Sequence, residues 1–173
     1  MSEALDWTYR VAEIPDGGLR VTREASEAER THLIEALGIL GCQRLVAEFT
    51  IRAIGKGHYR LAGKVAGELT QACVVSLEPV AQSVEGSFDV EFWPEGSLPE
   101  AGEEEIGALG AAEIEPVVHG RIDAGRIVFE TVATSLDPYP RKPGAIFEAD
   151  AVEDSELFDA GPFAALRKLK DRS

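Results

Sequence analysis

The sequence predicts an α+β fold: a bent, mainly antiparallel β-sheet, partly barrel-like, with a few packed helices. Polar and apolar residues alternate with period two over most of 45–93, which is typical of an antiparallel sheet with one polar face. Before that region, apolar residues recur at helical spacing between Ser26 and Gly38. The chain has 173 residues, the length of one ordinary domain, and we expect a single domain spanning 1–173.

The first elements are predicted as two short strands and a helix. Residues 7–12 and 19–23 favour strands, and the Pro- and Gly-containing segment between them favours a turn. Ser26 and Glu29 have the spacing of a capping box, in which each side chain bonds the backbone N–H of the other residue. Gly38 is a suitable C-terminal stop for that helix.

The central region is expected to consist of strands. Residues 45–54 and 59–69 form two of them, and the glycines of the second predict a bulge or a bend. A short apolar run over 72–77 ends at Glu78 and Pro79. The long strand over 80–93 places its acids on one face and its large apolar residues on the other, namely Val84, Phe88, Val90 and Phe92.

The second half of the chain mixes loop and helix signals. The Gly, Pro and Glu content near 94–112 predicts a mobile acidic loop. Residues 126–136 fit a helix by spacing and a strand by β-branched content, and we favour the helix. Three prolines exclude regular structure from 137–144. A C-terminal helical tail is expected over 162–170, with Pro at its start and cations at its end.

Composition excludes several classes of protein. No run of apolar residues is long enough to predict a membrane span. The first residues are acidic and lack an apolar stretch, so we expect no signal peptide and a cytoplasmic location. The two cysteines, Cys42 and Cys73, are then expected to be buried free thiols rather than a disulfide.

The familiar catalytic motifs are missing from the sequence. There is no phosphate-binding loop, no Gly-x-Ser-x-Gly elbow and no His pair at zinc-ligand spacing, since His32, His58 and His119 stand singly. We therefore expect no catalytic, cofactor-binding or metal site, and no cofactor. An enzyme whose site assembles only in space remains an alternative.

The charge distribution indicates a basic partner. The chain has 31 acidic and 17 basic residues, and no Lys or Arg lies between Lys64 and Arg121. Twelve acids fall in that gap: Glu68, Glu78, Glu85, Asp89, Glu91, Glu95, Glu100, Glu103, Glu104, Glu105, Glu113 and Glu115. Such a segment repels a phosphate backbone and attracts a basic protein, and Glu103, Glu104 and Glu105 form its densest run. A solvated loop that only confers solubility is the alternative.

Three stretches together resemble the YceD family, the large ribosomal RNA subunit accumulation proteins. The first has a strand, then Gln71, Cys73 and a Leu-Glu-Pro sequence formed by Leu77, Glu78 and Pro79. The second is the acidic loop with the following Ile122-Asp123 turn. The third is the proline-rich run with Asp137, Pro138 and Pro140, which together with the tail over 162–170 resembles an alphaproteobacterial branch.

The resemblance implies a non-enzymatic role in 23S rRNA accumulation or processing and in assembly of the large ribosomal subunit. The implied partner is a basic ribosomal protein or a pre-ribosomal particle. Many family members carry Cys-x-x-Cys where this chain has Cys73 and Ser76, so a zinc role is not carried over. An RNA-binding module is the alternative, and it would use the concentrated cations Arg141, Lys142, Arg167, Lys168 and Lys170.

Overall fold

The computed structural model describes residues 5–97 and 113–147. The chain divides into two units, Met1–Lys142 and Pro143–Ser173, and the elements below belong to the first. Most of the predicted acidic loop and the predicted C-terminal helical tail lie outside the described residues. Of the loop, only its first residues are described, at the end of a strand and in a short 3₁₀ helix, η2 (Glu95–Ser97).

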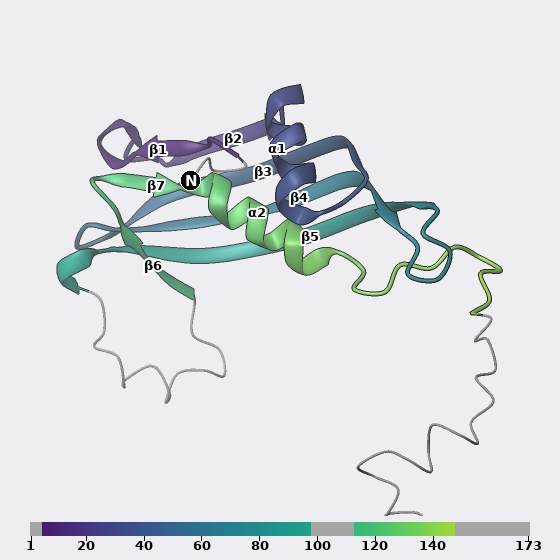
Figure 1. Ribbon diagram of the computed structural model, residues 1–173. Helices are drawn as coiled ribbons and strands as arrows, with labels where there is room; N and C mark the ends of the chain where they lie inside the picture. The colour runs from purple at the N-terminus through teal and green to yellow at the C-terminus, as the bar shows by residue number, and fades with distance from the viewer. Residues whose placement is uncertain (1–4, 98–112, 148–173) are drawn as a thin grey trace, which may run out of the picture. The chain divides into compact units, whose positions relative to one another are not determined.

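The main sheet has five strands in the order β2-β3-β4-β5-β6 (Figure 1). Their bounds are β2 Leu19–Glu24, β3 Gly41–Gly55, β4 His58–Ala72, β5 Pro79–Pro94 and β6 Glu113–Val117. All pairs are antiparallel except β5 with β6, which is parallel. The α+β class and the mainly antiparallel sheet are confirmed. The sheets formed by the described strands do not close into a barrel.

A second, two-stranded sheet pairs β1 (Thr8–Arg10) with β7 (Arg121–Asp123). The strand expected over 7–12 is therefore shorter than predicted, because Val11–Glu13 turns into a 3₁₀ helix, η1. Trp7, just before β1, is fully buried. Its carbonyl accepts hydrogen bonds from the N–H groups of Ala124 and Gly125, which anchors the start of the second helix.

Two helices cover one face of the main sheet, α1 (Glu27–Leu37) and α2 (Ala124–Ser135) (Figure 1). Both members of the predicted capping box are in place at Ser26 and Glu29, and Gly38 ends α1 in the left-handed conformation with φ 64°. The helix favoured over 126–136 is also confirmed, with Asp123 accepting a hydrogen bond from the Arg126 N–H. No helix in the described part of the chain is long and apolar enough to cross a membrane.

The side chains of β3, β4 and β5 alternate between the two faces of the sheet. We call the helix-covered side the inner face, and it carries Leu45, Ala47, Phe49, Ile51, Leu61, Val65, Leu69, Val84, Phe88, Val90 and Phe92. The opposite side is the open face, and it carries Arg44, Val46, Glu48, Thr50, Arg52, Arg60, Ala62, Lys64, Ala66, Glu68, Ser83, Glu85, Ser87, Asp89 and Glu91. The predicted division of β5 into an apolar and an acidic face is confirmed.

The bulge predicted at the glycines of β4 is wrong, because Gly63 and Gly67 pair in register with both neighbouring strands. Gly63 lies in register between Phe49 and Phe88, whose ring centroids are 6.3 Å apart, and Gly67 lies between Leu45 and Val84. A Cβ on Gly63 would lie 2.4 Å from the Phe49 Cβ, so the missing side chain makes room for the large neighbours. The register shifts of the β3–β4 pair occur elsewhere, between Cys42 and Arg44 and near the hairpin end.

Candidate functional site

The residues of the family-like motif converge on one place, which we call the motif junction. It joins residues 71–79, which are the end of β4, the following loop and the first residue of β5, to the proline-rich segment after α2 (residues 137–142). The Val74 N–H donates to the Pro140 carbonyl at 2.9 Å, and the Gln71 amide donates to the Asp137 carbonyl at 3.1 Å. Stretches more than 60 residues apart in sequence are thus held together by one backbone hydrogen bond and one from the Gln71 side chain.

Cys73 lies at the centre of the motif junction, and its side chain is fully buried. Its Sγ accepts backbone N–H groups from Val75 and Ser76, both at 3.4 Å, and from Lys142 at 3.3 Å. These donors, first of all the Lys142 N–H and then the Ser76 hydroxyl, lower the pKa of the Cys73 thiol to about 6. Cys73 is a buried, free cysteine, as predicted, and its sulfur also ties the two segments of the junction together.

The strand expected over 72–77 is replaced by a turn. β4 ends at Ala72, the Leu77 N–H donates to the Cys73 carbonyl, and the Cys73 N–H donates to the Glu78 carbonyl. Leu77 adopts the left-handed conformation with φ 60°, which is unusual for a residue with a branched side chain. The apolar run resembles a strand in the sequence, but its backbone groups bond within the loop and to Pro140 instead of to a neighbouring strand.

The predicted cations Arg141 and Lys142 also belong to the motif junction. Lys142 Nζ lies 2.8 Å from a carboxylate oxygen of Glu78, and this contact lowers the pKa of Glu78. Two large side chains of the junction segments are exposed, Leu77 at 76% and Tyr139 at 72%. Glu103, Glu104 and Glu105, the predicted acidic partner surface, lie outside the described residues.

No group of His, Cys, Asp or Glu side chains in the described ranges gathers at metal-ligand geometry. Both cysteines are free and buried.

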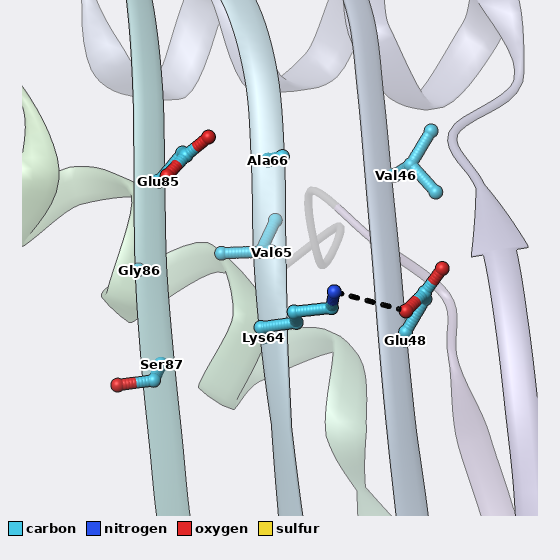
Figure 2. Close-up of a pocket in the computed structure, with 8 residues that line it drawn as sticks. All are labelled: Val46, Glu48, Lys64, Val65, Ala66, Glu85, Gly86 and Ser87. Atoms are coloured by element: carbon cyan, nitrogen blue, oxygen red, sulfur yellow. Dashed lines mark ion pairs between the residues drawn. The ribbon is translucent and has the colours of Figure 1, made fainter.

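A surface hollow lies on the open face of the sheet, and it is shallow and open to solvent. Figure 2 looks onto this face, with the helices behind the strands.

The hollow has an apolar floor and charged walls. Val46, Ala66 and Glu85 lie side by side on β3, β4 and β5, so the two small apolar side chains are flanked by a carboxylate. Glu48 stands on the β3 side, where Lys64 Nζ approaches it at 3.3 Å (Figure 2). Glu68 extends the hollow toward the motif-junction end of the strands.

The charges around the hollow are only partly compensated. Arg44 pairs with Glu24 at 3.4 Å, and Lys64 pairs with Glu48. Within the described part of the chain, no cation pairs with Glu68 or Glu85. These two carboxylates belong to the predicted acidic segment, and they leave the hollow with an excess of negative charge.

Sequence reasoning did not locate this hollow, although its signal was present. The alternating acids of 80–93 showed that β5 has one acidic face. What the sequence could not show is the register that brings Glu85 beside Ala66 and Val46, since strand pairing is set by tertiary structure.

Comparison with known proteins identifies the family. Residues 61–170 match the model of the family described as "Large ribosomal RNA subunit accumulation protein YceD". The chain belongs to the YceD family. The match includes the motif junction, β5 and most of β4, and the family's description connects the protein with accumulation of large-subunit ribosomal RNA. No curated protein and no solved structure gives a match to this chain.

Proposed function

We propose that this YceD-family protein is a non-catalytic binding factor that supports 23S rRNA accumulation and large-subunit assembly in the cytoplasm. Its partner is a basic ribosomal protein, free or within a pre-ribosomal particle. The observation that carries the proposal is the pair of uncompensated carboxylates, Glu68 and Glu85, beside the apolar floor of the open-face hollow.

The geometry of the hollow suits a Lys or Arg side chain of a partner. The aliphatic stem of such a side chain can lie on Val46 and Ala66 while its charged end meets Glu85 or Glu68. A shallow, open hollow suits a protein surface better than a small substrate, which is usually enclosed in a deep pocket. This favours binding over catalysis.

The remaining acids of the segment add long-range attraction. Surface charges act over about one Debye length, ~8 Å at physiological salt, so the acidic segment raises the encounter rate with a basic partner. In this proposal Glu103, Glu104 and Glu105 contribute to capture, while Glu68 and Glu85 contribute at the contact itself.

Affinity purification of the tagged protein from cells tests the proposal. We expect the wild-type protein to recover ribosomal proteins or large-subunit precursors. The double variant Glu68→Gln and Glu85→Gln should recover much less, because it loses two negative charges at the hollow while keeping side-chain size. The matched control is Glu27→Gln with Glu35→Gln, which removes the same charge from exposed positions on α1.

Equal recovery by the two double variants would contradict a role for the hollow, and recovery of no ribosomal material by the wild type would contradict the function itself. The loop is tested separately in a deletion strain. There, the variant Glu103→Gln, Glu104→Gln and Glu105→Gln should restore mature 23S rRNA poorly. Full restoration would mean that this run only confers solubility.

A further inference from the structure

The end of the open face next to the β3–β4 hairpin carries a group of arginines. Arg52 on β3 lies directly opposite Arg60 on β4, and Arg20 lies on the neighbouring strand β2, opposite Thr50. Like charges placed directly opposite each other destabilise a sheet unless an anion compensates them. Arg60 has such an anion in Asp89, which it contacts through two hydrogen bonds. Within the described residues, Arg20 and Arg52 have no ion-pair partner.

The hairpin adds a further cation. β3 ends at Gly55 and β4 begins at His58, so Lys56 and Gly57 form a two-residue turn. Both have positive φ, 54° and 78°, as a type I′ turn requires. Lys56 occupies a position where Asn or Gly is the usual residue, and it places its ammonium group at the tip of the hairpin.

An aromatic pair stands on the same face beside the arginines. The rings of His58 and Trp93 are stacked, with centroids 4.4 Å apart and planes at 14°. The alternation of β4 and β5 places both on the open face, because their neighbours Tyr59 and Phe92 point to the core. Trp93 Nε1 donates to a carboxylate oxygen of Glu91 at 2.9 Å, which fixes the indole.

We propose that this end of the open face binds a single-stranded segment of RNA. The residues that carry the proposal are Arg20, Arg52, Lys56, His58 and Trp93. Single-stranded nucleic acid is bound by aromatic side chains on which bases stack, together with cations that contact the phosphates. A sheet face that none of the described helices covers, and that presents both kinds of group, suits an RNA strand better than an acidic protein, which would not use the ring pair.

The proposal is independent of the acidic hollow. Four of the five residues precede the stretch that matches the family model, which begins at residue 61, so the proposal concerns this chain rather than the family. In this arrangement the open face has two ends, one for a basic protein and one for RNA. The RNA proposal and the basic-protein proposal are tested by separate experiments, and the failure of one does not affect the other.

Titration of the full-length protein with an oligouridylate of about 12 nucleotides tests the proposal, since single-strand sites cover roughly 4–16 nucleotides. Trp93 is half-buried, whereas the other tryptophan, Trp7, is fully buried, so a base stacked on Trp93 should quench part of the tryptophan fluorescence. Trp93→Phe should retain binding, measured by anisotropy of labelled RNA, and should lose the quenching.

The charge contribution is tested with two double variants that remove the same positive charge. Arg20→Gln with Arg52→Gln should weaken binding and reduce the slope of log affinity against log salt by roughly 1.4, the value for two lost phosphate contacts to a single strand. Arg141→Gln with Lys142→Gln should leave both unchanged. The reverse result would place RNA at the motif junction and overturn the proposal.

Two further outcomes would overturn the proposal. One is absence of binding to the oligouridylate at low salt. The other is equal binding of a polyglutamate of the same charge, which would indicate an acidic protein as the partner of this end. Tighter binding of the oligouridylate than of polyglutamate, with quenching that depends on Trp93, supports RNA.

Discussion

The two faces of the five-stranded sheet are built from the same three strands and follow different rules. On the inner face, large and small residues alternate across neighbouring strands, as Phe49, Gly63 and Phe88 do, and the neighbours leave no space for change. On the open face, the same strands present Glu48, Lys64 and Ser87, which are polar and exposed and are not confined by close packing. We therefore expect the inner face to determine stability and the open face to contribute to binding.

This difference predicts which substitutions change stability and which change binding. A change on the inner face should alter the free energy of unfolding and affect binding only through loss of folded protein. A change on the open face should leave stability nearly unchanged and alter the affinity for charged partners. The predictions below test that division, beginning with the largest expected effect.

Phe92→Ala should give the largest loss of stability. The Phe92 side chain is 2% exposed and belongs to the central core cluster, so its removal leaves a cavity. We expect a decrease in the free energy of unfolding of about 3–5 kcal/mol, measured by urea denaturation. Ser87→Ala, on the open face of the same strand, is the control and should change it by less than about 0.5 kcal/mol. Equal effects of the two variants would contradict the division of the faces.

Gly63→Ala should destabilise the protein by about 1–3 kcal/mol through overpacking. Its Cβ would lie 2.4 Å from the Glu48 carbonyl oxygen, a backbone atom that cannot move without disturbing β3. Gly96→Ala makes the same chemical change where no atom lies within 4 Å of the added Cβ, and its effect should stay within about 0.5 kcal/mol. A thermal unfolding midpoint that falls equally in both variants would mean that packing against Phe49 is not the cause.

Much of the fold was predictable because local signals and tertiary packing agree. The capping box at Ser26, the long alternating strand that became β5 and the helix after Asp123 all depend on residues close in sequence. The role of Gly63 was not predictable in this way, since a glycine in a strand indicates either a bend or a close neighbour. Only the partner strands decide between the two.

The candidate site was predictable in parts. The resemblance singled out Cys73 and Pro140, and the structure brings their two segments together. The resemblance could not show that Cys73 accepts three N–H groups, one of them from a residue 69 positions away. The hollow and the arginine end of the open face depend on strand register, which no single segment encodes.

Ser26→Ala should remove about 1 kcal/mol of stability by uncapping α1, one of the elements that cover the inner face. The same cap has a pH dependence. Burial acts to raise the pKa of Glu29, but hydrogen bonds from Ser26 and Trp7 outweigh it and the net shift is downward. A carboxyl group whose pKa is lowered by folding stabilises above its unfolded pKa, and this stability is lost as pH falls through the folded value.

The difference between wild type and Glu29→Gln in urea denaturation should therefore be largest near neutral pH. It should shrink as the pH falls from about 5 through the folded pKa of Glu29, because protonation removes the charge that the substitution removes. A difference that stays constant from neutral to acidic pH would show that the Glu29 charge does not contribute to the cap.

The smallest effect on stability, and the sharpest test of the open face, is expected from Lys64→Gln. Lys64 and Glu48 are both largely solvent-exposed, and such pairs contribute about 0–1 kcal/mol, so unfolding should barely change. Binding should change in the opposite direction from Glu68→Gln with Glu85→Gln. Loss of the ammonium group leaves Glu48 free at the wall of the hollow, and a lysine-rich peptide should bind roughly two- to five-fold more tightly by calorimetry.

Arg10→Gln is the matched control, because it breaks the exposed Arg10–Glu13 pair and removes the same charge away from the hollow. Equal tightening by both variants would mean that net charge alone attracts the peptide, whereas tightening by Lys64→Gln alone locates the contact at the hollow.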